Sequence, residues 1–312
     1  MKKCLIIGST VCDVILYVDK LPTTQQDIHP KKQVVSLGGC AFNVAHVLHH
    51  LKVPYTLISP VGSGMYGDFV KQHLQKQGMH SEIAVQQENG CCYCMVEDSG
   101  ERSFMSYHGA EYTFDPAWLR KLDVNDYAYA YVCGLEVEDV DGMKLVNALA
   151  SFQGQIIFAP GPRGMHIQQE RLDILYGYKP IMHLNDLEIE QMMQEEDLLQ
   201  AMRKLYALTQ NKVIVTVGKQ GVYLYDGNHI QHIETSKVEV VDTIGAGDSH
   251  VGGYLVGKSL GYEDTKALSL ANRIAGKVVS ISASTLSKEE YAKLYKELSN
   301  ENHSFTNKKD EI

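Results

Sequence analysis

Short apolar runs alternate along this chain with longer segments in which apolar side chains recur at helical spacing. The runs at 3–7 and 155–159 are typical of buried parallel strands, which carry apolar residues on both faces. Segments such as 41–51 and 66–77 collect their apolar residues on one side of a helix. This alternation predicts an α/β fold with a mostly parallel central sheet covered by helices on both faces.

The same pattern locates the remaining elements. Further helices are expected at 115–122, 140–152, 168–176, 186–209, 264–281 and 288–298. Further strands are expected at 14–18, 33–37, 55–61, 83–86, 91–96, 102–107, 129–133, 181–184, 212–217 and 222–225, and in a run ending at Val240 and Val241. Three of these strands, between 83 and 107, follow one another without a helix, and Asp-Ser-Gly-Glu at 98–101 is a hairpin signal. They predict a small antiparallel flap that pairs with the strands at 14–18 and 33–37.

Composition narrows the class of protein. The chain has 312 residues, a net charge of −9 and seven scattered cysteines. Its acidity argues against a nucleic-acid backbone or an anionic membrane as partner. No uncharged apolar run approaches the ~20 residues that span a bilayer. Scattered cysteines, odd in number, are typical of a reducing compartment, so we expect a cytoplasmic protein.

The stretch 242–248, Asp-Thr-Ile-Gly-Ala-Gly-Asp, carries the clearest chemistry. A turn of small residues at the start of a helix leaves backbone N–H groups unpaired, and with the positive helix end they form an anion site. Asp248 would take a proton from a nucleophile while the N–H groups of Gly245, Ala246 and Gly247 hold the charge of a transferred phosphoryl group. The alternative is a strand-to-helix connection in which Asp248 only satisfies the helix dipole.

Polar residues and glycines near the start of the chain suggest a second constellation. Gly38 and Gly39 precede a helix and would let the backbone approach a ligand closely. Asn43 falls in the first turn of that helix, and Asp13 lies a short way upstream. Glu136 follows a strand, at the end where ligands collect in parallel sheets. A plain helix entry and exposed carboxylates fit the same residues, and Glu136 has acidic neighbours at 138, 139 and 141.

Three later patterns could bind a ligand, but each also has a purely structural explanation. Asn185 followed by Glu188 matches a capping box at a helix start. A strand ends near Thr216, and Gly218 and Gly221 follow it. A tight turn before the next strand would explain these glycines without a ligand. Asn272 lies within a helical pattern, where a buried asparagine needs no ligand.

The string at 242–248 resembles the C-terminal signature of the ribokinase-like (PfkB) family of carbohydrate and nucleoside kinases, and the other motifs follow in that family's order. The resemblance implies a three-layer α/β/α ribokinase-like fold. It implies a single domain over 1–312, with a β-sheet lid built from about 13–37 and 85–110, and lids of this kind often pair in a homodimer. The polar segment 300–312 is expected to be a disordered tail.

The resemblance also implies a reaction, the transfer of the ATP γ-phosphoryl group to a primary hydroxyl of an unphosphorylated sugar or nucleoside. Asp248 would be the general base, and the backbone of Gly245, Ala246 and Gly247 the anion hole. The sugar would lie against Asp13, Gly38, Gly39, Asn43 and Glu136. ATP would contact Asn185, Thr216, Gly218, Gly221 and Asn272, and Glu188 would hold Mg²⁺ through water.

Other features stay open. The family often binds K⁺ at the position of Asp242, together with a later small-residue loop that contains glycine, but 280–285 here contains none. Arg102 would contact a substrate carboxylate or be solvated, and the lid aromatics Tyr93, Phe104, Tyr107 and Tyr112 would stack on a nucleobase or pack the lid. A non-catalytic sugar- or nucleotide-binding paralogue is the alternative, although such a protein would usually lack Asp248. A dinucleotide-dependent oxidoreductase would need a glycine fingerprint that is absent after the first strand. His46, His49 and His50 share a helix face, without the further ligands of a metal site.

Overall fold

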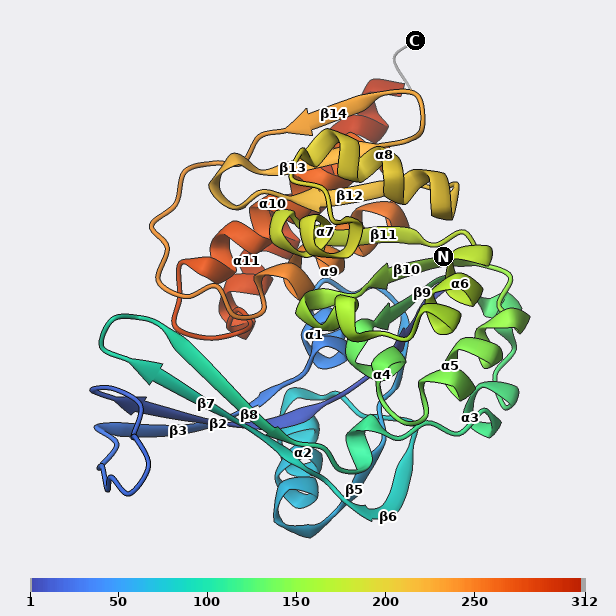
Figure 1. The fold of residues 1–312 in the computed structure, drawn as a ribbon. Helices are drawn as coiled ribbons and strands as arrows, with labels where there is room; N and C mark the ends of the chain where they lie inside the picture. The colour runs from blue at the N-terminus through green and yellow to red at the C-terminus, as the bar shows by residue number, and fades with distance from the viewer. Residues whose placement is uncertain (1, 310–312) are drawn as a thin grey trace.

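An eight-stranded sheet forms the centre of the computed structural model, which describes residues 2–309 (Figure 1). Its strand order is β14-β13-β12-β11-β10-β9-β1-β4. Six strands pair in parallel: β1 (Lys3–Ile7), β4 (Tyr55–Ile58), β9 (Tyr127–Cys133), β10 (Gln155–Ala159), β11 (Ile181–Asn185) and β12 (Val213–Thr216). β13 (Val222–Tyr225) and β14 (Ile230–Ile233) add an antiparallel edge. The predicted sheet is confirmed, and β14 is a strand that the sequence pattern did not reveal.

Alternating side chains of the central strands separate the two cores. On β1, Ile6 packs with Val47 of α1 (Cys40–His50) and Leu255 of α9 (Ala246–Ser259), whereas Leu5 packs with the opposite cluster. α10 (Asp264–Val279) and α11 (Lys288–Lys309) belong to the first side with α1 and α9. The second side contains α5 (Gly142–Ala148), α6 (Gln169–Gly177), α7 (Asp186–Met193) and α8 (Leu198–Thr209). The protein is therefore a three-layer α/β/α structure.

A separate four-stranded sheet forms the lid and extends from the body at the lower left of Figure 1. Its order is β3-β2-β7-β8, with β2 at Val11–Val18, β3 at Lys32–Gly38, β7 at Cys91–Glu97 and β8 at Arg102–Tyr107. β7 and β8 form the predicted antiparallel hairpin, which joins the early strands through a parallel β2–β7 pair. The strand expected at 83–86 does not join this sheet. It is β6 (Ala84–Glu88), which pairs instead with β5 (Val61–Ser63) beside α2 (Gly64–Gln77).

Several expected boundaries were wrong. The single helix expected at 186–209 is two helices, because α7 ends at Gln194 in a left-handed conformation. The helix expected at 140–152 is α5 followed by a 3-10 turn, with the short helix α4 (Gly134–Glu138) before it, and that at 115–122 is only α3 (Ala117–Arg120). The short 3-10 helices are Ala110–Tyr112, Val124–Asp126, Leu149–Ser151, Gly161–His166 and Gly218–Gln220.

The chain around Val240 and Val241 is not a strand. Both side chains are more than half exposed, and no neighbouring strand edge pairs with this segment in the described part of the chain. The last helix, expected to end at 298, is α11 and continues through Lys309. The last three residues of the tail expected at 300–312 lie outside the described residues.

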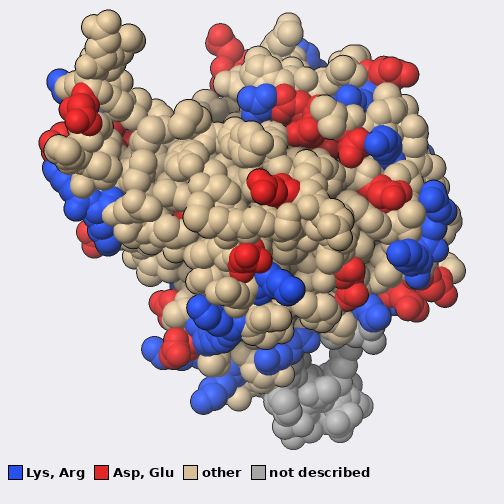
Figure 2. Space-filling view, turned by 90° about the horizontal axis from the view of Figure 1, so that it is seen from below, with Lys and Arg blue, Asp and Glu red and all other residues tan. Residues whose placement is uncertain are grey.

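The surface shows no continuous basic band on the face drawn in Figure 2, where acidic and basic side chains are interspersed. Among the described helices, none combines the length and the apolar composition that crossing a membrane requires.

Candidate active site

The anion turn lies at the start of α9. Gly245 precedes the helix with φ 73°, and a Cβ there would collide with the carbonyl oxygen of Ser284, so this position requires glycine. The N–H of Ala246 donates to the Thr243 carbonyl at 3.2 Å, so this N–H group points into the loop and already has an acceptor. Among the described residues, the N–H groups of Gly247 and Asp248 have no acceptor, and no side chain caps the helix. These two donors and the helix dipole make an anion site.

Asp248 is held by a residue from the other end of the sequence. Asn43 on α1 donates from Nδ2 to Oδ2 of Asp248 at 2.9 Å, and Asn43 is only 4% exposed. Burial raises the pKa of Asp248 to about 6, and the hydrogen bond from Asn43 opposes this shift. A carboxyl group with such a pKa is suited to accept a proton near neutral pH.

Asp13 lies directly against the Gly38 backbone. A Cβ on Gly38 would collide with the Asp13 carboxylate, and a Cβ on Gly39 would lie 2.5 Å from the carbonyl oxygen of Ser9. Both glycines therefore allow β3 and the start of α1 to approach β2 and the end of β1. Burial raises the pKa of Asp13 to about 7. The structure thus brings together three members of the predicted substrate site.

Glu136 lies on α4 at the carboxyl end of β9. Its Oε1 accepts a hydrogen bond of 2.7 Å from the N–H of Ser9, while Oε2 is buried and has no partner among the described residues. Burial raises the pKa of Glu136 to about 7. A buried carboxylate oxygen without a donor is an acceptor left for a ligand hydroxyl or a water.

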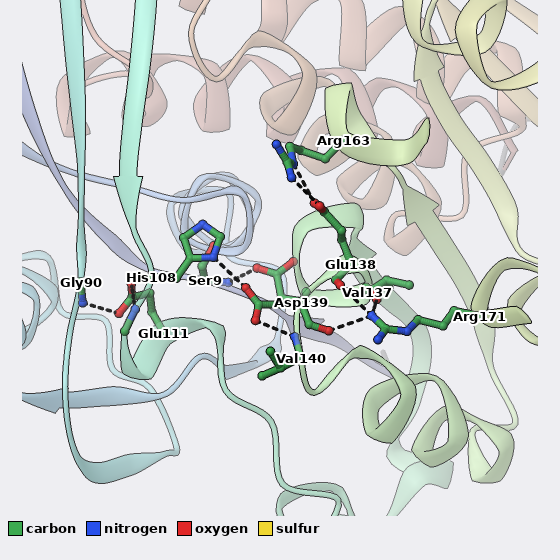
Figure 3. A network of polar contacts seen from close by, with 12 residues as sticks. Ser9, Gly90, His108, Glu111, Val137, Glu138, Asp139, Val140, Arg163 and Arg171 are labelled. Atoms are coloured by element: carbon green, nitrogen blue, oxygen red, sulfur yellow. Dashed lines mark hydrogen bonds and ion pairs between the residues drawn. The ribbon is translucent and has the colours of Figure 1, made fainter. Parts of the chain in front are cut away.

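The acidic neighbours of Glu136 are all engaged elsewhere, which removes the ambiguity among them, and Figure 3 shows the partners of Glu138 and Asp139. Glu138 forms an ion pair with Arg163, and Asp139 accepts from Nδ1 of His108 at 2.7 Å. Asp141 lies 2.6 Å from the amino group of Lys144. Only Glu136 is directed at the end of β1.

Arg171 anchors the segment that carries Glu136. Its Nη1 donates to the carbonyls of Val137, Glu138 and Asp139 at 2.7, 2.6 and 2.8 Å (Figure 3). This cationic group therefore caps the carboxyl end of α4, where carbonyls lack helical partners. Arg171 was missed by sequence reasoning, because only the tertiary fold brings α6 beside α4.

Asn185 and Glu188 form the capping box that their spacing allows. Asn185 Oδ1 accepts from the N–H of Glu188 at 2.8 Å, and Glu188 Oε2 accepts from the N–H of Asn185 at 3.0 Å. Burial raises the pKa of Glu188. The box uses one oxygen of each side chain, and the Asn185 amide nitrogen and the second Glu188 oxygen have no hydrogen-bond partner among the described residues. These groups fit a hydrated Mg²⁺, which keeps most of its waters and needs few protein ligands.

The turn after β12 contains Thr216, Gly218 and Gly221. Both glycines have positive φ, 55° and 102°, and a Cβ on Gly221 would collide with the Ile233 carbonyl oxygen. Thr216 Oγ1 lies 3.4 Å from the Leu184 carbonyl oxygen. The backbone conformation and close packing of the turn therefore explain its glycines without a ligand. The backbone at 218–220 is nevertheless exposed at the carboxyl end of β12.

Asn272 is committed to the fold. Its Nδ2 donates to the carbonyls of Ile233 and Glu234 at 3.0 and 3.2 Å, and its Oδ1 lies 3.1 Å from Nε2 of His250. His250 in turn lies 2.8 Å from Nε2 of His183. Asn272 also lines a cavity of about 390 Å³ between α10 and 234–236, which the other predicted ATP residues do not line. The structural interpretation accounts for the hydrogen bonds of its amide.

Asp242, the predicted ligand of a monovalent cation, faces a cationic side chain of the protein itself. Its Oδ2 lies 2.8 Å from Nη2 of Arg102, a lid residue, and its Oδ1 accepts from the N–H of Ile244 at 2.8 Å. Both carboxylate oxygens are thus engaged by groups of the chain itself. Arg102 is neither solvated nor free to contact a substrate carboxylate in this structure.

Packing explains several of the other sequence candidates, whereas the lid aromatics Phe104 and Tyr107 are exposed. His46 lies 3.0 Å from Gln77 and 3.2 Å from His50 through Nε2, and the described residues include no metal-binding cluster of His, Cys, Asp and Glu. In the lid, Tyr93 hydrogen-bonds to Tyr66, and Tyr112 stacks on His108.

A mostly parallel α/β/α sheet, a β-lid and an anion turn that carries an aspartate define the fold of the ribokinase-like proteins. The model of the pfkB family of carbohydrate kinases matches residues 1–290, and the chain belongs to this family.

Similar curated proteins are sugar kinases. The chain is 33% identical over 281 residues to the uncharacterized sugar kinase YegV of Escherichia coli (strain K12), with 88% of each chain covered. It is 26% identical over 279 residues to the ribokinase of Bacillus subtilis (strain 168), covering 88% of this chain and 92% of that one.

Solved structures confirm the fold. A ribokinase from Thermotoga maritima superposes with a TM-score of 0.81 at 22% identity, over 95% of this chain and 100% of that one. An Arabidopsis thaliana ribokinase complexed with ribose and ATP gives 0.77 at 20% identity, over 95% of this chain and 99% of that one.

Proposed function

We propose that this chain is an ATP-dependent sugar kinase that transfers the γ-phosphoryl group to a primary hydroxyl of an unphosphorylated sugar. The observation that carries the proposal is the hydrogen bond from Asn43 to Asp248. It joins the expected sugar-binding segment to the anion turn, so that one carboxylate serves both. The kinship with sugar kinases and ribokinases supports the same reaction.

Asp248 acts as the general base in this proposal. Its carboxylate accepts the proton of the attacking hydroxyl, and the backbone turn of Gly245, Ala246 and Gly247 holds the oxygens of the transferred phosphoryl group. The N–H groups of Gly247 and Asp248, which have no acceptor among the described residues, are available as donors for this task. Asn43 keeps the base oriented and disfavours its protonated form.

Two further carboxyl groups hold the sugar. Asp13 and the unpaired Oε2 of Glu136 accept hydrogen bonds from sugar hydroxyls, with the backbone of Gly38 and Gly39 beneath the ring. Carboxyl groups accept hydrogen bonds from neutral hydroxyls and, when ionised, repel an anionic substrate. Because Arg102 is paired with Asp242, it offers no site for a sugar acid.

ATP and Mg²⁺ supply the phosphoryl group and neutralise its charge when they are bound. Glu188 holds the hydrated metal through its free oxygen, and Asn185 and the turn at Thr216, Gly218 and Gly221 bind the nucleotide. Asn272 supports the adenine side of the site by fixing the end of β14. Lid closure excludes water, which would otherwise compete as an acceptor.

A homodimer through the lid is part of the proposal. Phe104, Met105 and Tyr107 on the edge strand β8 are 59%, 60% and 68% exposed. Large apolar side chains on an unpaired edge favour association with another copy. Analytical ultracentrifugation should give twice the chain mass, and the triple substitution of these residues by serine should give a monomer.

A coupled assay of ADP release over neutral pentoses, hexoses and nucleosides tests the function. We expect ATP-dependent phosphorylation of at least one neutral sugar, and a nucleoside as acceptor would change the substrate class but not the reaction. Stabilisation by ATP or sugars without any ADP release would instead favour a binding protein of the same fold.

A further inference from the structure

An ion pair connects the lid to the segment before the anion turn. Arg102, at the first residue of β8, extends its guanidinium to Asp242, with Nη2 and Oδ2 2.8 Å apart. The two side chains are only 19% and 11% exposed. A second contact runs parallel to it, since Tyr17 of lid strand β2 lies 3.5 Å from Ser282 through their hydroxyls. Lid strands thus contact the segment before the anion turn, at Asp242, and the loop after α10, at Ser282.

The surroundings of Asp242 fix the carboxylate in place. The N–H groups of Val241 and Asp242 both donate to the Val279 carbonyl, at 2.7 and 3.1 Å. Oδ1 accepts the Ile244 N–H, which leaves Oδ2 for the guanidinium. Gly245 lies against the Ser284 carbonyl oxygen on the following loop. The carboxylate therefore lies where the turn and the loop after α10 meet.

The guanidinium has no other acceptor among the described residues. Its Nε is buried without a partner, so Asp242 is its one ionic contact there. A partly buried carboxylate without a counter-charge would be costly, and a guanidinium stays protonated at every relevant pH. While the lid lies against the body, the pair neutralises Asp242 in a largely buried setting, unlike an exposed surface ion pair.

We propose that Arg102 is the fixed cation of this site and takes the place of a monovalent metal ion at Asp242. Arg102 is a positioning residue. By neutralising Asp242 it stabilises the backbone turn that begins at Gly245, and because it lies on the lid, it does so when the lid is against the body. Phosphoryl transfer should then be independent of K⁺. This inference rests on the proposed function for its kinetic part only.

The test compares Arg102→Met with the wild-type chain in KCl, NaCl and choline chloride at equal ionic strength. Two quantities are measured: the phosphorylation rate with the sugar found in the screen, and the midpoint of thermal unfolding with ADP present. Lys31→Met is the matched control, because Lys31 is a lid cation whose ion-pair partners, Asp19 and Asp98, both lie in the lid. Arg102→Lys retains the charge and serves as a second variant if Arg102→Met folds poorly.

We expect wild-type and Lys31→Met rates within twofold across the three salts. Arg102→Met should lose at least about fivefold in choline chloride and recover in KCl, and its unfolding midpoint should rise in KCl relative to choline chloride. Arg102→Lys should keep the salt-independent behaviour. Activation or stabilisation of the wild-type chain by K⁺ would overturn the proposal, and so would an equal loss for Arg102→Met in all three salts. If no acceptor is phosphorylated, the proposed function fails, while the unfolding midpoints still decide the role of Arg102.

Discussion

Asn43 and Asp248 are 205 residues apart in the sequence and 2.9 Å apart in the fold, measured between amide nitrogen and carboxylate oxygen. The contact depends on the packing of α1 against α9, which place their first turns side by side. Glycines help to make this close approach possible, since a Cβ on Gly252 of α9 would lie 2.8 Å from the Cβ of Val47 on α1. The helix pairing therefore sets the position of the proposed base.

Asp248→Asn should reduce the rate of phosphorylation by a factor of about 10² to 10⁴, the usual contribution of a general base. The amide is close in shape to the carboxylate but cannot accept the proton. ADP affinity, measured by calorimetry, should stay within a few-fold of the wild-type value. Asp68→Asn on the exposed face of α2 is the matched control and should change neither quantity. A wild-type rate in Asp248→Asn would exclude the residue as the base.

The pH dependence of kcat/KM should report the same carboxyl group. Burial raises the pKa of Asp248 to about 6, and the base works only when it is ionised, so its contribution to kcat/KM should rise with pH around a midpoint near 6, with a further change near 7 where Asp13 and Glu136 titrate. Asn43→Ala removes the hydrogen bond that opposes this shift, so the midpoint of the rise should move to higher pH. An unchanged midpoint in Asn43→Ala would mean that another group controls the profile.

The same shift has a consequence for stability. The folded state holds the Asp248 proton more tightly than the unfolded state, whose pKa is near 3.8, so this group lowers stability as pH rises from about 4 to about 6. Above that range the buried carboxylate costs at most about 3 kcal/mol. Asp248→Asn should therefore raise the unfolding midpoint, relative to wild type, more at pH 8 than at pH 4. A difference that does not vary with pH would contradict this account.

Arg171→Met should weaken sugar binding more than nucleotide binding. Without the guanidinium, three carbonyls at the end of α4 lose their donor, which should cost about 1–3 kcal/mol of stability and loosen the segment that carries Glu136. We expect a raised KM for the sugar and little change in the KM for ATP. Arg163→Met is the control, since its exposed ion pair with Glu138 should contribute little. Equal increases of both KM values would indicate general destabilisation instead.

Local sequence was enough for features whose partners lie close in the chain. The capping box of Asn185 and Glu188 depends on a spacing of three residues. The adjacent glycines at 38 and 39 indicate that another part of the molecule or a ligand comes close to the backbone there. The parallel strands could be predicted because their apolar runs report burial on both faces. The order of the motifs was sufficient to identify the family, and the family was sufficient to predict the three-layer fold.

Features that depend on distant partners could not be read in this way. Arg102 had two interpretations in the sequence, and neither was its pairing with Asp242, because nothing local to either residue specifies the other. Val240 and Val241 have the composition of a strand, but the N–H of Val241 donates to the carbonyl of Val279 at the end of α10 rather than to a strand. Glu136 differs from its acidic neighbours only through the fold, which directs its carboxylate at Ser9 and theirs at other partners.

The two outer glycines of the anion turn should respond differently to alanine. At Gly245 the new Cβ would meet the Ser284 carbonyl oxygen in a backbone conformation with φ 73°, so Gly245→Ala should lower the unfolding midpoint as well as the rate. At Gly247 the new Cβ would meet nothing within 4 Å, so Gly247→Ala should fold with nearly wild-type stability. If the open space beside Gly247 belongs to the phosphoryl group, the methyl group should still reduce kcat by about tenfold or more, in line with the geometric demands of near-attack positioning. Thermal unfolding and steady-state kinetics on both variants separate the two effects. Wild-type kinetics in Gly247→Ala would mean that the phosphoryl group does not approach this part of the turn.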